Sequence, residues 1–373
     1  MTKAKLLYKK LRSALPLYFI IICLAALLSL SVHLLSFLIT PFADFINSYP
    51  AAALRAILAL ITSVIPFSIA ETMIILLPAI FIFICILLFV FARRNDQKSL
   101  KSILIALISV LLSVYILFVF TLGTSYHTKG LDEKMGLERR PISTAELEST
   151  CYTLAEGINS VASEIEIEKG SSSSLPYSYR ELCKKLDSAY DKVSAEYSFI
   201  SSFPSYTKRI MLSKPMTYTH ISGVYSFFTG EANVNVNYPD YILPFTVAHE
   251  MAHQRGIARE DEANFVAFLV CIASDDAYIK YSGYTQVFEY AASALYSADK
   301  NVYFDMLDTV NEKYIYEALA YNDFMDTYKD STISNVSSSV NDAFQQMQGQ
   351  SAGIKSYGLV VDLAAAYFRD SDK

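Results

Sequence analysis

Three long stretches without a charged residue occupy the first third of this 373-residue chain and constrain its fold more than any other feature. They are Ser13–Ala43, Thr72–Ala92 and Ser102–Leu122. As helices, all three are long enough to cross a hydrocarbon core of about 30 Å at about 1.5 Å per residue. The chain is 53% hydrophobic and only 18% charged, which is too apolar for a wholly soluble protein. The sequence therefore predicts three transmembrane helices, at about residues 15–40, 72–92 and 103–122.

Basic residues predict the orientation of these helices, because segments rich in Lys and Arg remain in the cytoplasm. One basic cluster precedes the first span (Lys3, Lys5, Lys9, Lys10 and Arg12), and a second joins the other two spans (Arg93, Arg94, Lys98 and Lys101). Three spans place both clusters inside and everything after Leu122 outside. The first stretch is too long for a cleaved signal peptide and lacks a small-residue cleavage site, so we expect a retained anchor.

The segment Ala51–Ala70 is apolar but is interrupted by Arg55 and Pro66. If it were a fourth span, the basic residues 93–101 would lie outside and the rest of the chain inside, against the positive-inside rule. We therefore expect an interfacial or re-entrant helix at about residues 51–70.

The charges divide the chain into the same two parts. Residues 1–123, the predicted transmembrane region, hold 10 Lys/Arg and 3 Asp/Glu, whereas residues 124–373 have a net charge of −13. A nucleic-acid-binding domain needs a basic face for phosphates, so this composition excludes that class. Residues 124–373 are predicted to form one acidic extracytoplasmic domain.

Helical patterns dominate this second part. Ser143 and Glu146 form a capping box, and an apolar stripe at helical spacing follows it, made of Leu147, Cys151, Leu154, Ile158, Val161 and Ile165. We expect Thr144–Ile167 and Tyr177–Ile200 to form an antiparallel pair of helices around the Gly170–Ser174 loop. In that pair, Cys151 and Cys183 would be offset by about 16 Å along the axis, too far for a disulfide.

A short β-hairpin is predicted just before the most informative motif. Val224–Phe228 and Ala232–Asn237 read as strands joined at Thr229-Gly230, and the second strand alternates apolar residues with three asparagines. One face of this strand is suited to packing and the other to hydrogen bonding.

Residues 249–256 read His-Glu-Met-Ala-His-Gln-Arg-Gly, after a helix start at Leu243-Pro244 and before a helix stop at Gly256. His249 and His253 are four residues apart, so both imidazoles lie on one helical face and can bind one Zn²⁺. Glu250 is placed to contact a metal-bound water as a general base. A chance occurrence of H-E-x-x-H is rare with five histidines in the chain. The alternative is a helix with two incidental surface histidines.

A catalytic Zn²⁺ usually has three protein ligands, and the residues that follow supply three acidic candidates. Glu260 is favoured, because a helix restarting there places it on a face of small residues with Ala263, Asn264 and Ala267 that can approach the histidine helix. Glu262 points about 200° away on the same helix, and Asp261 is the third possibility. A third histidine is excluded at the position of the extended motif, since residue 259 is Arg.

The combination of H-E-x-x-H with E-x-x-A-N at residues 260–264 resembles the gluzincin metallopeptidases. That resemblance implies Glu260 as the third zinc ligand and Asn264 as a residue that orients the ligands. Further motifs are similar to the bacterial domain-of-unknown-function family 3810: Pro66-Phe-Ser68, Gly230–Asn235, the histidine motif, Glu262–Phe265, Tyr281–Tyr284 and Gly353–Gly358. This similarity covers most of the chain and implies a membrane-anchored zinc peptidase, with a mainly α, zincin-like extracytoplasmic domain that carries the short β-hairpin. Only six residues separate His253 from Glu260, which departs from the gluzincin pattern.

The gluzincin resemblance also implies roles outside the metal motif. Ala232–Asn237 becomes a candidate edge strand that pairs with the backbone of a peptide substrate. A donor must stabilise the developing oxyanion, and the candidates are Tyr357, Tyr284, Tyr281 and His220. In this scheme the metal activates a water, Glu250 accepts its proton, and the carbonyl of a peptide is attacked.

Three functions are compatible with these residues. The favoured one is a zinc endopeptidase outside the cytoplasm, and the second is a zinc amidase that acts on cell-wall peptides. The third is a receptor or scaffold with a structural metal, which the presence of Glu250 disfavours because such a site needs no general base. The charged residues around the motif, such as Arg255, Arg259 and Asp261, disfavour an intramembrane protease.

Overall fold

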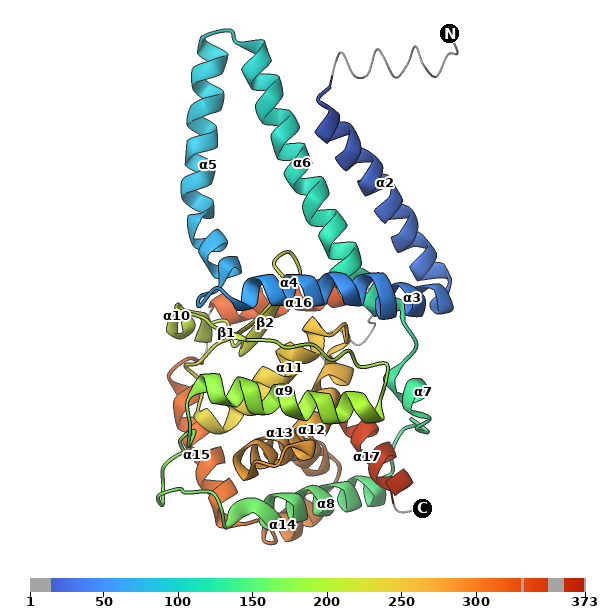
Figure 1. Ribbon diagram of the computed structural model, residues 1–373. Coiled ribbons are helices and arrows are strands. Elements are labelled where there is room, and N and C mark those ends of the chain that lie inside the picture. The colour runs from blue at the N-terminus through green and yellow to red at the C-terminus, as the bar shows by residue number, and fades with distance from the viewer. Residues whose placement is uncertain (1–14, 330–331, 348–358, 372–373) are drawn as a thin grey trace.

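The computed structural model describes residues 15–329, 332–347 and 359–371, and it is mainly helical with one small sheet. Three long helices project from one side of a helical domain (Figure 1). They are α2 (Leu17–Leu38), α5 (Ile69–Arg93) and α6 (Gln97–Thr121). Their bounds lie within a few residues of the three predicted spans, and each is long and apolar enough to cross a membrane.

A fourth apolar segment runs across the ends of these helices instead of alongside them. It consists of α3 (Thr40–Ile46), the π-helical turn η1 (Asn47–Ala51) and α4 (Ala52–Ser63), and it too is long and apolar enough to span a membrane. In Figure 1 it lies roughly perpendicular to α5 and α6, on top of the domain. The interfacial helix at about residues 51–70 stays a prediction, and the observed helix α4 ends at Ser63, before Pro66.

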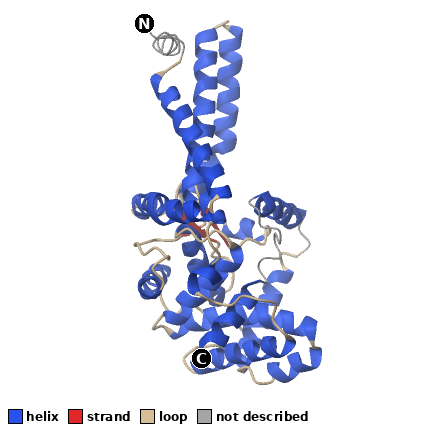
Figure 2. Ribbon diagram, turned by 90° about the vertical axis from the view of Figure 1, so that its right-hand side faces the viewer, coloured by secondary structure: helices blue, strands red, loops and turns tan. Residues whose placement is uncertain are grey.

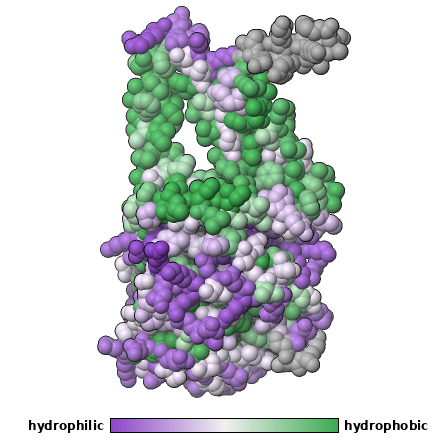
Figure 3. Space-filling view, viewed as in Figure 1, coloured by the Kyte–Doolittle hydropathy of each residue, from purple (hydrophilic) through white to green (hydrophobic). Residues whose placement is uncertain are grey.

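One face of α4 is fixed to the domain and the other is exposed and apolar. Arg55 is fully buried and donates from Nη2 to the Asn47 carbonyl at 2.9 Å, while the Asn47 amide donates to the carbonyl of Gly256 at 3.2 Å. The outward face carries exposed apolar side chains: Ile57, Leu60, Ile61 and Val64. In Figure 3 these apolar surfaces form a band that continues from the projecting helices across the top of the domain.

Acidic side chains attach the start of α5 to the domain. Both carboxylate oxygens of Glu231 accept hydrogen bonds from the first backbone amides of α5, those of Ile69 and Ala70, at 3.0 and 2.9 Å. Glu71 in turn accepts from the amides of Met211 and Leu212 at 2.9 and 2.8 Å. A carboxylate at a helix N-terminus satisfies otherwise unpaired donors, so these contacts hold α5 and the sheet together.

The domain is built from short connecting helices and a core of longer ones. The connecting elements are η2 (Gly123–His127), α7 (Leu131–Met135), α10 (Ser213–Thr217) and η3 (Asp240–Ile242). The longer helices are α8 (Thr144–Ala162), α9 (Tyr179–Glu196), α11 (Leu243–Gln254), α12 (Glu260–Ala273), α13 (Ala277–Ala298), α14 (Lys300–Leu307), α15 (Glu312–Asp326), α16 (Thr332–Met347) and α17 (Val360–Ser371). Figure 2 shows that helices dominate both the projecting part and the domain.

Helix α12 lies at the centre of this core and is almost entirely buried. It packs against α11, α13, α9 and α17. The capping box of Ser143 and Glu146 is present at the start of α8, as predicted. The predicted pairing of Thr144–Ile167 with Tyr177–Ile200 is wrong, however, because α8 packs on α13 whereas α9 packs on α12. The two apolar stripes face the core from different sides, and Cys151 and Cys183 are both free and buried in it.

The sheet has three strands in the order β1 (Lys208–Arg209), β3 (Glu231–Val234) and β2 (Gly223–Ser226). Strand β2 pairs with β3 in the antiparallel hairpin that the sequence predicts, and β1 pairs with β3 in parallel. The assignment of Ala232–Asn237 as an edge strand is therefore wrong. Strand β3 is central because a distant segment of the chain, residues 208–209, covers its other side, and among the described strands the edges are β1 and β2.

Candidate functional site

The histidine motif lies on α11, which begins at Leu243 with Pro244 in its first turn. The helix ends at Gln254, and Gly256 adopts φ +91°, a conformation that favours glycine and stops the helix. Both predicted boundaries are confirmed. His249 and His253 are one turn apart with ring centroids 4.6 Å from each other, so the two imidazoles face the same side of the helix.

Glu260, the first residue of α12, completes a cluster with the two histidines. Its Oε2 atom lies 3.2 Å from His249 Nε2 and 3.5 Å from His253 Nε2. One ligand atom from each of the three residues lies within 4.8 Å of the others. Three such donors at this range could hold a metal ion.

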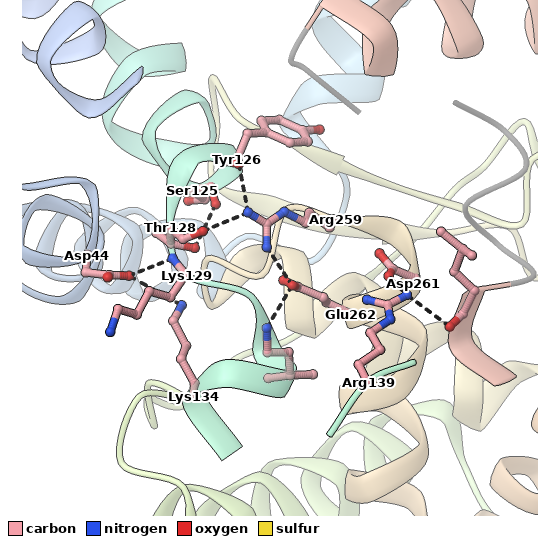
Figure 4. A network of polar contacts seen from close by, with 12 residues as sticks. Asp44, Ser125, Tyr126, Thr128, Lys129, Lys134, Arg139, Arg259, Asp261 and Glu262 are labelled. Carbon is pink, nitrogen blue, oxygen red and sulfur yellow. Dashed lines mark hydrogen bonds and ion pairs between the residues drawn. The ribbon is translucent and has the colours of Figure 1, made fainter. Parts of the chain in front are cut away.

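The two alternative acidic residues on α12 have other partners (Figure 4). The Oε1 atom of Glu262 accepts hydrogen bonds from the Leu131 amide at 2.9 Å and from Arg259 at 2.7 Å. Asp261 forms an ion pair of 2.7 Å with Arg139. Of the three acidic candidates, the structure places only Glu260 with the histidine pair.

Arg259 connects the start of α12 to the base of the projecting helices. Besides Glu262, its guanidinium donates to the carbonyls of Tyr126 and Thr128 at 3.2 and 2.7 Å. The next residue, Lys129, donates its amide to Asp44 of α3 at 3.1 Å. These contacts, drawn in Figure 4, fix the backbone beside Glu260 relative to the apolar segment above it.

The surroundings of the histidines orient their Nε2 atoms. His253 Nδ1 lies 2.7 Å from the carbonyl of Ile257, an acceptor, so Nδ1 carries a proton and Nε2 is the ring nitrogen that faces Glu260. His249 Nδ1 is buried without a hydrogen-bond partner among the described residues. Burial lowers the pKa of His249, and the neighbouring Glu260, His253 and Asn264 side chains also act on it. The orienting role that the gluzincin resemblance implies for Asn264 stays a prediction.

The three side chains of the cluster are electrostatically coupled. Burial opposes charge on Glu260, but the neighbouring imidazoles hold the pKa of its carboxyl well below the usual range. Burial also disfavours a charged His253, yet the carboxylate of Glu260 raises the pKa of that imidazole to about 9. Burial lowers the pKa of His249. The cluster thus combines one carboxylate with two imidazoles at close range, as in metal sites of the His₂Glu type.

Glu250 is buried beside this cluster, with only 4% of its surface exposed. Its Oε2 atom has no hydrogen-bond partner among the described residues. Burial raises the pKa of Glu250 to about 8, and the charge of Glu260 acts in the same direction. A buried carboxyl oxygen without a partner is costly, so Glu250 is an unusual feature beside the cluster of His249, His253 and Glu260.

Strand β2 passes directly over Glu250. An added Cβ atom at Gly223, the first residue of β2, would lie 2.4 Å from Glu250 Oε1. Among the described strands β2 has a strand partner on one side only, and its first residue lies against the carboxylate of Glu250. The edge next to the candidate site therefore belongs to β2, while the sequence analysis placed it on the neighbouring strand.

Among the described residues, three predicted oxyanion donors have other surroundings. Tyr281 is fully buried, and Tyr284 packs against Gly157 of α8 and Phe268 of α12. His220 Nε2 lies 2.9 Å from the carbonyl of Tyr328. The fourth candidate, Tyr357, lies outside the described residues.

Two tyrosines that the sequence analysis missed do lie near Glu260. Burial is the main cause of a raised pKa for both Tyr126 and Tyr290, and the charge of Glu260 adds to it. Tyr290 also interacts with Asn264, which lies between it and His249. No local signal distinguishes these two residues among the 27 tyrosines of the chain, since their position depends on how α13 and η2 pack.

Comparison with known proteins identifies a family and no closer relative. Neither the curated proteins nor the solved structures contain a match to this chain. One family model, described as "Protein of unknown function (DUF3810)", matches residues 48–365. This range includes α4, the sheet and the cluster of His249, His253 and Glu260, called the His–Glu cluster below. Since this match covers far more than half of the sequence, the chain belongs to the DUF3810 family of proteins of unknown function.

Proposed function

We propose that this protein is a membrane-anchored, zinc-dependent endopeptidase. The observation that carries the proposal is the convergence of His249, His253 and Glu260 within 4.8 Å, with the buried carboxyl group of Glu250 next to them on the same helix. A structural metal site needs the three ligands but gives no reason to bury a fourth, unpaired carboxyl group there.

His249 and His253, through Nε2, and Glu260, through a carboxylate oxygen, would hold the metal. A zinc ion bound there would polarise a substrate carbonyl and make a water molecule more acidic. The contact between His253 Nδ1 and the Ile257 carbonyl fixes one ligand in its binding tautomer. The position of Glu260 is fixed through the contacts of its neighbour Arg259.

Glu250 would act as the general base and later return a proton to the leaving amine. A carboxylate in a dry environment is a stronger base than one in water, because burial disfavours its charge. The pKa of about 8 lies closer to neutrality than that of an ordinary carboxyl group, and a base is most effective when its pKa is near the working pH.

Peptide substrates would be positioned along β2. An extended peptide can add to an open sheet edge through backbone hydrogen bonds, and β2 is the edge strand that contacts Glu250 through Gly223. The absence of a side chain at Gly223 allows the Glu250 carboxylate to lie against the strand. Tyr290, whose pKa responds to Glu260 and Asn264, is a further candidate for oxyanion stabilisation.

We infer that the site lies outside the cytoplasm. The turn between α5 and α6 carries Arg93, Arg94 and Lys98, and Figure 1 places it at the end of these helices farthest from the domain. Positive charges favour the cytoplasmic side, so a bilayer crossed by α5 and α6 would separate this turn from the domain. We base the proposed zincin-like character of the domain only on the cluster of His249, His253 and Glu260.

The test is the Glu250→Gln variant of the full-length protein, with Glu166→Gln, a change on an exposed loop residue, as the matched control. We expect Glu250→Gln to retain zinc and fold but to lose peptide hydrolysis by about 10²–10⁴-fold, because the amide cannot accept a proton. Zinc content by mass spectrometry and cleavage of a mixed peptide library would be measured on both variants.

Two outcomes would redirect the proposal. Zinc binding without hydrolysis of any peptide by the wild-type protein, together with normal cellular function of Glu250→Gln, would favour a receptor or scaffold with a structural metal. Hydrolysis restricted to cell-wall peptides would favour the amidase. A wild-type protein without zinc affinity would refute the metal site itself.

A further inference from the structure

Helix α16 has an apolar stripe that the rest of the described structure leaves uncovered. Ile333, Val336 and Val340 occur at spacings of three and four residues, so they share one helical face. They are 60%, 59% and 64% exposed. Isolated exposed apolar residues are ordinary, but three on one face of one helix indicate a surface that is covered by something else.

The polar side of α16 is unusual in having almost no charge. Residues 332–347 contain a single charged residue, Asp342, and their other polar residues are Ser, Thr, Asn and Gln. Asn335 and Ser338 lie on the side opposite the stripe, and the buried Ser334 faces the domain. A helix without basic residues offers no ion pairs to acidic lipids, so apolar burial is its main source of binding energy at a membrane surface.

The position of α16 indicates what covers the stripe. In Figure 1 it lies at the height of α4, where α2 and α6 end and α5 begins. Figure 2 shows it, bounded at both ends by grey trace, at the same height on the opposite side of the molecule from α3 and α4. The exposed apolar face of α4 is continuous with the helices long enough to span a membrane, so this height marks the edge of the apolar layer.

We propose that α16 is a membrane-surface helix whose stripe of Ile333, Val336 and Val340 inserts into the leaflet that α4 contacts. It binds uncharged lipid, because it lacks the basic residues that recognise acidic headgroups. Together, α4 and α16 support the domain on the bilayer from two sides. The height of the His–Glu cluster below the lipid surface is then fixed at two points.

The experiment uses tryptophan fluorescence, since the chain contains no Trp. Full-length Val336→Trp and Ser338→Trp variants are reconstituted into phosphatidylcholine vesicles, with and without brominated acyl chains. Val340→Trp repeats the test on the stripe. All three positions are exposed, so none of these changes disturbs the core.

We expect brominated lipid to quench the two stripe variants about twofold or more, since an interfacial helix buries its apolar face about 5–10 Å deep. Ser338→Trp should instead be quenched by aqueous iodide, and adding acidic lipid should leave all three results unchanged. Iodide quenching at both faces would overturn the proposal, as would lipid quenching at both. A blue-shifted emission of Val336→Trp without lipid quenching would also overturn it and indicate a protein partner or second copy on the stripe.

Discussion

Gly223 of β2 lies directly against the carboxylate of Glu250, so close that a single added carbon would be 2.4 Å from Oε1. The contact joins the edge of the sheet to the acidic residue of the histidine helix. These two residues are 27 positions apart in the sequence, and no motif contains both. This contact places the edge strand β2 and the candidate general base in one small region. A methyl group added at residue 223 tests whether hydrolysis depends on the contact.

Gly223→Ala is expected to impair hydrolysis while leaving zinc binding intact. The new methyl group must displace either β2 or the Glu250 carboxylate, and a shift of about 1 Å at a reacting group can reduce turnover about hundredfold. Val224→Ala, on the exposed side of the same strand, is the control and should keep nearly full activity. Equal activity of the two variants would separate β2 from catalysis.

Removing any one of the three proposed metal ligands is expected to weaken zinc binding. His249→Ala, His253→Ala and Glu260→Ala should each lose the single zinc equivalent or bind it much more weakly, because each removes one of three donors. Zinc content of the purified protein, measured by mass spectrometry, is the readout. Full zinc occupancy in His253→Ala would exclude the assignment.

Glu262→Ala should keep its zinc but lose stability. Its carboxylate accepts from Arg259 and from the Leu131 amide, and removing a buried acceptor costs about 1–3 kcal/mol when its donors remain unpaired. Thermal unfolding followed by circular dichroism would detect the change. Loss of zinc from Glu262→Ala together with its retention in Glu260→Ala would exchange the roles of the two residues.

Gly256→Ala should destabilise the contact between α11 and α4. At φ +91° any side chain is strained, and here the added carbon would also lie 2.3 Å from the Arg55 guanidinium. We expect a loss of about 1–3 kcal/mol for the backbone strain and more for the collision. Gly136→Ala is the matched control, since Gly136 has φ +71° but nothing within 4 Å of an added Cβ. An equal loss in both variants would show that Arg55 simply moves aside.

The membrane orientation predicts the location of the chain's C-terminal end. A reporter active only outside the cytoplasm, fused after Lys373, should be active, because the basic residues between α5 and α6 favour the cytoplasm. The control is the same reporter inserted between Asn95 and Gln97, in the turn of that hairpin, where it should be silent. The opposite pattern would mean that Thr40–Ser63 spans the bilayer.

Local sequence patterns predicted the elements well where a single helix or turn decides the outcome. The capping box of Ser143 and Glu146 starts α8, Pro244 lies in the first turn of α11, and Gly256 follows its end in a positive φ conformation. These signals depend on backbone donors and on steric limits within a few residues, so they act wherever the segment lies in the fold. The apolar stretches that predicted α2, α5 and α6 belong to the same class.

The sequence patterns did not predict which distant helices and strands pack against each other. The apolar stripes of α8 and α9 are both buried, as predicted, but α8 packs on α13 and α9 packs on α12. Likewise the alternation of β3 identified a strand, but only the parallel partner at Lys208 made it central. An apolar periodicity specifies that a face is buried and does not specify what buries it.

The sequence by itself determined the apolar helices, the histidine helix and the identity of three nearby acidic residues, because all of these follow from the order of residues along one segment. The sequence favoured Glu260 among those three, but only the tertiary structure places its carboxylate beside the histidines. The other two acidic residues pair instead with Arg139 and Arg259. The same packing, not any local propensity, brought Gly223 to Glu250.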